Sequence, residues 1–145
     1  DSALTRIYEV AMPDERIHDA TVPARERLVE VLWQTLEPFA PTAKARETWS
    51  HVFDAFISPT STDEARASYV VLNQRAALRF EAWLVILEQE GSLPAGDNRR
   101  RAAFLMTVTN GLALERALPA TQTQLEDERT SLALAVEAVF VGVER

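Results

Sequence analysis

The stretch RAAFLMTVTNGLALERAL, residues 101–118, has the apolar spacing of a long helix but carries an Asn-Gly pair in its interior. Glycine inside a helix costs about 1 kcal/mol relative to alanine, and Asn-Gly is usually a turn signal. A missing side chain lets a crossing helix approach closely, so we expect Gly111 to lie where another helix packs against this one. A helix kink without further consequence is the alternative interpretation.

The segment that follows this stretch predicts a helical hairpin. The short connection PATQT, residues 119–123, joins two long helices, and each of them has apolar residues on more than one side. One side can pack on the domain's own core, whereas the other needs a partner. A second copy of the same hairpin would give an intermolecular four-helix bundle about a two-fold axis. The candidate interface residues are Gly111, Leu114, Leu118, Leu132, Val136, Val139, Phe140 and Val143.

The remaining sequence also has helical periodicity, with no sustained alternation typical of strands. We expect an all-α bundle of about six helices, with the last two forming the dimer bundle. We expect Thr42 to cap the third helix, Ser61 and Glu64 to form a capping box, and Gly91 to end the central helix. That central helix is apolar over most of its circumference, which predicts that other helices surround it. The predicted helices cover residues 2–12, 23–36, 42–57, 63–90, 97–118 and 123–143, with Asp97 or Asn98 as the cap of the fifth.

Composition limits the classes of function. A length of 145 residues fits one domain, and the absence of cysteine excludes disulfides and thiolate chemistry. The net charge is -7, with Lys44 as the sole lysine, so the chain as given should bind DNA poorly. No apolar run of membrane-spanning length and no basic-then-apolar leader are visible, so we expect a cytoplasmic protein without a membrane partner.

Few groups in the sequence could support catalysis or hold a metal. His18 and His51 are the two histidines, and neither lies in a Ser-His-Asp arrangement that the sequence can support. Glu15 and His18 have the Glu-x-x-His spacing of di-iron bundles, but Glu47 precedes His51 by four residues, so the required second motif is missing. We therefore expect no enzyme, no catalytic residues, no metal and no cofactor.

Aromatic side chains at helix-core positions, with a few polar neighbours, have the composition of a small-molecule pocket. Core packing is the alternative explanation for most of them. The candidate pocket residues are Trp33, Trp49, Phe53, Phe56, Tyr69, Asn73, Phe80, Trp83, Phe104, Thr107 and Asn110.

The stretch EGSLPAGDNRRRAAFLMTVTNGLALERAL, residues 90–118, resembles the C-terminal half of bacterial TetR-family transcriptional regulators, especially the BetI-like type. In that family a glycine-containing turn and an Arg-rich helix start lead through a pattern like AAxLxxxxDGLAL into the first dimerisation helix. The corresponding segments here are residues 101–105 and 110–114. Asn110 occupies the position where the family usually has an aspartate. The asparagine side chain can still form hydrogen bonds but carries no charge.

This resemblance implies a homodimeric domain that binds a small apolar or amphipathic effector. It also implies that operator DNA is bound only through an N-terminal helix-turn-helix, which this chain does not contain. By analogy, the effector would shift the helix at residues 2–12 and so alter operator affinity, and typical couplings of about 1–3 kcal/mol suffice for this. The alternative from another class is a structural dimerisation or protein-interaction bundle that binds no ligand.

Overall fold

Helices follow one another along the part of the chain that the computed structural model describes, residues 15–142, and no strand occurs in that part. The five α-helices are α2 (Ala24–Gln34), α3 (Thr42–Val52), α4 (Asp63–Gln89), α5 (Asn98–Glu115) and α6 (Gln124–Val141). Three short turns accompany them, the 3-10 helices η1 (Glu15–His18) and η2 (Glu37–Phe39) and the π-helix η3 (Phe53–Ile57). The all-helical prediction is confirmed for these residues, whereas the predicted helix at 2–12 and the interface candidate Val143 lie outside them.

The predicted helix bounds agree closely with the structure, but two of the predicted caps are wrong. The hydroxyl of Thr62, not of Ser61, accepts the hydrogen bond from the Ala65 N–H at 3.1 Å, and Ser61 Oγ is buried without a partner in the described part of the chain. Thr42 is the first residue of α3 and makes no side-chain cap, because Pro41 occupies the cap position. The predicted acidic cap of α5 is confirmed, since Asp97 accepts from the Arg100 N–H at 3.0 Å.

Gly91 ends α4 in the way the sequence predicts. Its φ of 87° lies in the left-handed region that glycine adopts without steric cost. The Gly91 N–H donates to the carbonyl of Glu88 and the Ser92 N–H donates to that of Leu87, both at 3.0 Å. These two bonds form a Schellman motif, which satisfies carbonyls that the helix end would otherwise leave unpaired.

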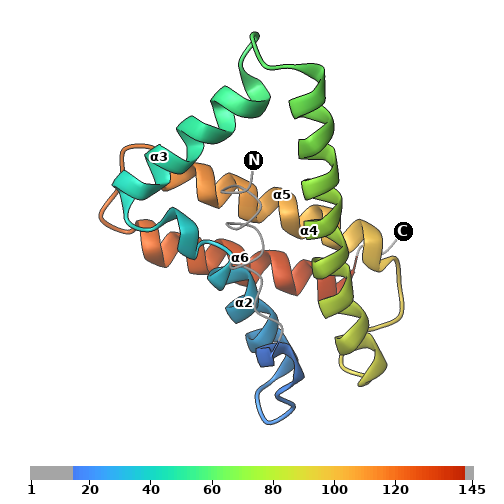
Figure 1. Cartoon of the computed structure of the whole chain (residues 1–145). Coiled ribbons are helices and arrows are strands. Elements are labelled where there is room, and N and C mark those ends of the chain that lie inside the picture. Colours follow the sequence, from blue (N-terminus) through green and yellow to red (C-terminus); the bar gives the residue numbers. More distant parts are fainter. Residues whose placement is uncertain (1–14, 143–145) are drawn as a thin grey trace.

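The helices pair as α4 with α5, α2 with α6, and α5 with α6 in an antiparallel hairpin (Figure 1). In the same view α3, α4 and α5 outline a triangle, and the π-helix η3 lies where α3 approaches the start of α4. Two side chains of α3 also bond to the last turns of α5 and the residues that follow it. The Trp49 indole N–H donates to the Ala113 carbonyl and the Arg46 Nε to the Ala117 carbonyl, both at 2.9 Å.

The core lies between these helix pairs. One side of α4 is buried in it, including Ala76, Phe80, Trp83 and Leu87. The prediction that other helices surround α4 is wrong for the described part of the chain. Val70, Val71 and Leu78 are about half exposed or more, because only α5, η3 and η1 make substantial contact with this helix among the described elements. None of the helices in residues 15–142 combines the length and hydropathy needed to cross a membrane.

Candidate functional site

The cavities described within residues 15–142 are lined by none of the predicted pocket residues. Phe80 and Trp83 stack with ring centroids 5.0 Å apart and are only 2% and 1% exposed, so both belong to the core. A domain core takes large aromatic residues wherever several helices meet, and sequence composition does not distinguish that role from a pocket wall. Phe80 and Trp83 are therefore core residues.

Three further candidates lie on the outer side of α5. Phe104 is 44% exposed, Thr107 and Asn110 are exposed, and the Thr107 hydroxyl donates to the Ala103 carbonyl of its own helix. The interior side of α5 is occupied instead by residues such as Leu105. The prediction that Phe104, Thr107 and Asn110 line an interior pocket is therefore wrong for this chain.

Some of the predicted pocket residues lie together at the end of the molecule where α3 and α4 approach each other. The rings of Phe56 on η3 and Tyr69 on α4 pair at a centroid distance of 5.1 Å, and both side chains are half-buried. Asn73 is half-buried one helical turn beyond Tyr69, and Phe53 is 49% exposed. This α3–α4 end thus joins aromatic surface to an amide that can orient a ligand.

The two remaining tryptophans are Trp33 on α2 and Trp49 on α3. Trp49 packs against Phe39 with ring centroids 5.7 Å apart. The half-buried ring of Trp33 faces two guanidinium groups, those of Arg129 at 4.3 Å and Arg116 at 5.4 Å from its centroid. Cation–π contacts of this kind hold arginines and aromatic rings in a fixed geometry.

A cavity of about 630 Å³ opens beside these tryptophans, between the segment from Phe39 to Thr42 and the connection at residues 120–126. The volume is within the usual range of small-molecule sites. Phe39 and Leu125 supply apolar wall, Thr42 supplies a hydroxyl, and Arg116 supplies a guanidinium. The connection between α5 and α6 that forms one wall lies at the left of Figure 1. Sequence reasoning missed this cavity because loops from two distant segments form it.

Arg116 and Glu128 form a buried ion pair behind this cavity. Arg116 Nε donates to both carboxylate oxygens of Glu128, at 2.7 and 3.2 Å, and Arg116 Nη1 donates to the Leu36 carbonyl at 2.7 Å. The spacing of apolar residues in the sequence could have indicated that both members of this pair are buried. Arg116 follows Leu112 by four residues and Glu128 precedes Leu132 by four, so both charges extend buried stripes.

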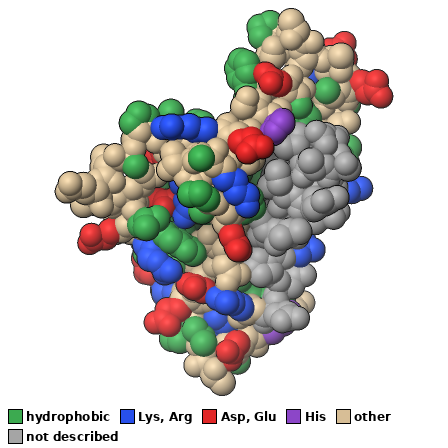
Figure 2. All heavy atoms as spheres, turned by 60° about the vertical axis from the view of Figure 1, so that its left-hand side comes forward, with side chains coloured by type: hydrophobic (Ala, Val, Ile, Leu, Met, Phe, Trp, Pro, Cys, Tyr) green, Lys and Arg blue, Asp and Glu red, His purple; other side chains and the backbone are tan. Residues whose placement is uncertain are grey.

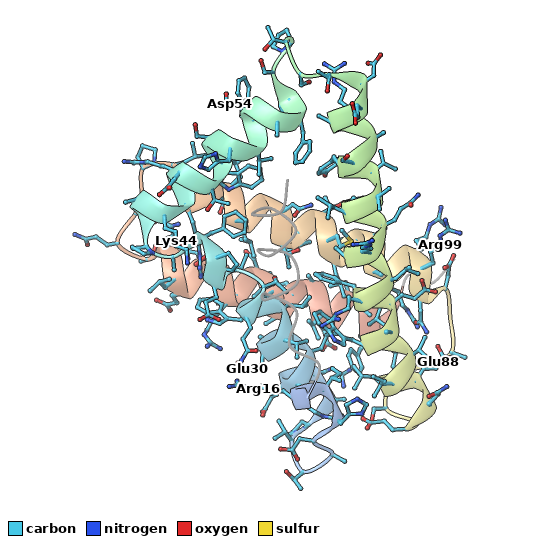
Figure 3. The ribbon with its side chains drawn as sticks, viewed as in Figure 1. Arg16, Glu30, Lys44, Asp54, Glu88 and Arg99 are labelled. Carbon is cyan, nitrogen blue, oxygen red and sulfur yellow. The ribbon has the colours of Figure 1, made fainter. Side chains whose placement is uncertain are left out.

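A second groove, of about 500 Å³, lies between α2 and α6 and is rimmed by exposed ion pairs. Arg25 pairs with Glu137 at 2.7 Å, and Glu30 pairs with both Arg16 and Arg129 at 3.6 Å. Figure 3 shows Arg16 and Glu30 close together at α2, and Figure 2 shows basic and acidic side chains interspersed over the lower part of its face. Exposed pairs of this kind contribute little stability.

The predicted dimer residues divide between core and surface. Leu132, Val136, Val139 and Phe140 are at most 4% exposed in the single chain, so a second copy could not reach them without unfolding the core. Those four assignments are wrong, because α6 points these residues at the core that it shares with α2 and α5. Leu114 and Leu118 are 45% and 50% exposed. Gly111 is exposed, and apart from its chain neighbours and the adjacent backbone of α5 no atom lies within 4 Å of the point where a Cβ would stand.

Further exposed apolar residues lie on the sides of the two hairpin helices that face away from the core. Leu134 and Val141 of α6 are 68% and 65% exposed, and Phe104 of α5 is 44% exposed. We call this surface the outer hairpin face. Its members are Phe104, Gly111, Leu114, Leu118, Leu134 and Val141.

The two histidines lie on the surface of the described part of the chain. His18 and His51 are exposed, and within residues 15–142 no group of three or more His, Asp or Glu side chains is placed to hold a metal ion.

Comparison with known proteins gives no match: no family model, no curated protein and no solved structure matches the chain. The fold and its surfaces define a class, the all-helical bundles with an antiparallel C-terminal hairpin.

Proposed function

We propose that this chain is the effector-binding and dimerisation domain of a TetR-type transcriptional regulator. The observation that carries the proposal is the outer hairpin face, where Leu114, Leu134 and Val141 are each close to half exposed or more on two adjacent helices. A large exposed apolar surface on a globular domain usually marks an interaction site. A second copy related by a two-fold axis would cover the face with the same face of its partner.

Gly111 supports this arrangement. Apart from its chain neighbours and the adjacent backbone of α5, no atom of the chain lies within 4 Å of the position that a Cβ would take, so close packing against another helix of the monomer does not explain the glycine. A partner helix crossing the outer hairpin face would meet backbone at this point and could approach closely. The same glycine would otherwise only weaken α5.

The proposed effector site is the α3–α4 end. Phe56 and Tyr69 offer half-buried aromatic surface, and Asn73 offers an amide beside it. A small apolar or amphipathic molecule with one polar group fits this chemistry. In an intact regulator the bound effector would change the operator affinity of an N-terminal DNA-binding head, since the acidic charge of this chain disfavours DNA contact.

A structural dimerisation bundle without a ligand is the second candidate. The burial of Phe80 and Trp83 in the core favours it, because a structural bundle needs large aromatic residues at such core positions. This candidate shares the dimer and differs only at the α3–α4 end.

Solution mass by light scattering tests the dimer. We expect a wild-type dimer that Leu114→Glu and Leu134→Glu each convert to monomer, since either change places charge in an apolar interface. Leu78→Glu is the matched control, because Leu78 is 65% exposed on α4 rather than on the hairpin, and this change should leave the dimer intact. A monomeric wild type, or a dimer unaffected by both hairpin variants, would contradict the proposed interface.

Binding of the dye 1-anilinonaphthalene-8-sulfonate separates the two candidates. We expect saturable binding that Phe56→Ala weakens and Val71→Ala does not, since Val71 is exposed on α4 and is not part of the aromatic pair. Thermal melting of both variants confirms that they fold. Equal dye binding by wild type and Phe56→Ala would favour the structural bundle.

A further inference from the structure

The cavity beside Trp33 and Trp49 is separate from the proposed effector site. Phe39, on η2, and Leu125, near the start of α6, both line it, whereas the α3–α4 end is built from η3 and α4. Its volume of about 630 Å³ would hold a small organic molecule.

One hydrogen-bond donor of this cavity is unused by the described part of the chain. Arg116 is 8% exposed, its Nε is bonded to Glu128, and its Nη1 is bonded to the Leu36 carbonyl. Within residues 15–142 no group accepts a hydrogen bond from Nη2. Nη2 is also not fully buried, so part of its surface remains accessible. Nη2 is therefore available to a ligand, and the bonds to Glu128 and Leu36 hold the guanidinium in place.

The charges around the cavity decide which ligand this donor suits. Glu128 neutralises Arg116 through the 2.7 Å ion pair, and Glu126 adds a carboxylate to the cavity wall. An anionic ligand would meet no net positive charge and one like charge. A neutral carbonyl oxygen would accept from Nη2 without that repulsion, and its apolar body would pack against Phe39 and Leu125.

We propose that this cavity is a second small-molecule site, which binds an uncharged aromatic carboxamide or ketone through the Arg116 guanidinium. The ligand ring lies against Phe39, and its carbonyl oxygen accepts from Arg116 Nη2. Two tryptophans adjoin these residues, because Trp49 packs on Phe39 and Trp33 lies against Arg116. A ligand in the cavity therefore lies one residue away from each of these tryptophans.

Titration with benzamide and benzoate, followed by NMR of the isotope-labelled chain, tests the proposal. We expect benzamide to shift the backbone signals of residues 120–126 and the side-chain N–H signals of Arg116. We expect benzoate to bind about fivefold more weakly, because about 1 kcal/mol of repulsion from a nearby carboxylate corresponds to such a ratio. Tighter binding of benzoate, or saturation with benzamide that leaves the Arg116 signals unmoved, would overturn the assignment.

Two variants locate the site without disturbing the buried ion pair. Ala120→Phe and Thr121→Phe place a ring into the cavity from exposed positions of the connection, and each should weaken benzamide binding at least about tenfold. Ala67→Phe, at an exposed position of α4, is the matched control and should bind like wild type. Thermal melting verifies that each variant folds. Undiminished benzamide binding by a folded Ala120→Phe or Thr121→Phe chain would show that the ligand does not occupy this cavity.

Discussion

The Nε atom of Arg116 lies 2.7 Å from Oε2 of Glu128, and both side chains are more than nine-tenths buried. This pair joins the end of α5 to α6 and holds the guanidinium against the cavity and the Trp33 ring. Removing two charges from water is costly, so such a pair contributes little net stability, whereas one partner left alone is strongly destabilising.

Arg116→Met should lower the free energy of unfolding by about 3–5 kcal/mol, because it leaves the Glu128 charge buried and unpaired. The double variant Arg116→Met with Glu128→Leu should recover most of that loss. Urea denaturation of both variants and of Glu128→Leu completes a double-mutant cycle. Equal losses for the single and double variants would mean that the ion pair is not the source of the penalty.

Leu132 and Leu134 provide a test of which residues of α6 form the core. Leu132→Ala should cost about 2–5 kcal/mol in unfolding free energy at any protein concentration, since Leu132 is fully buried in the single chain. Leu134 is 68% exposed, so Leu134→Ala should hardly change the stability of the monomer. Denaturation at several protein concentrations separates folding from association. The reverse order of effects would contradict the burial described for α6.

The carboxylate of Glu90 predicts how stability depends on pH. Hydrogen bonds from Arg27 and from the Ser92 hydroxyl lower the pKa of Glu90 below its ordinary value of 4.5. The Glu90 carboxylate therefore binds a proton less readily in the folded state than in the unfolded state. Its contribution to the free energy of unfolding is complete above about pH 4.5 and is lost as pH falls through the lowered pKa.

Melting temperatures between about pH 6 and pH 3 check this dependence. Glu90→Gln should flatten the fall in stability below about pH 4.5, while the exposed variant Glu47→Gln should retain the wild-type slope. Asp19 adds a contribution of the same sign in both variants, because hydrogen bonds from Thr21 lower its pKa. An unchanged slope in Glu90→Gln would exclude Glu90 as a source.

Two glycines should respond to alanine in opposite directions. Gly91→Ala should destabilise the fold by about 1–2 kcal/mol, because the left-handed conformation at φ 87° disfavours a Cβ. Gly111→Ala should stabilise the monomer by about 0.5–1 kcal/mol, because it lies within a helix with open space around it. In the proposed dimer the same Gly111→Ala change should weaken association. Denaturation and light scattering measure the two effects, and a Gly111→Ala chain that associates like wild type would leave the glycine without a role at the interface.

Much of the fold could be predicted from the sequence. Helical periodicity, Gly91 and Asp97 indicated the bounds of α4 and α5 because these signals act within a few residues of the positions they govern. The caps at Ser61 and Thr42 were wrong for the same local reason, since a shift of one residue leaves the composition of the helix start unchanged.

The candidate site could be predicted only in part. Phe56 and Tyr69 meet as a pair, but Phe80 and Trp83 lie in the core, and Phe104 lies on the outer side of α5. An apolar stripe has the same composition on a core, a pocket wall or an interface. Only the directions in which neighbouring helices approach distinguish the three.

Residue order was enough to establish that the described chain is helical, where its helices begin and end, and that its last two helices have apolar residues on more than one side. The packing of the helices then settled which of those sides is buried: Leu132 and Val136 face the core, whereas Leu134 remains exposed. Packing also brought Phe39 and Arg116 to one cavity from segments far apart in the chain. Helix formation depends on residues three or four positions apart, whereas burial and cavities depend on contacts between segments that local sequence does not encode.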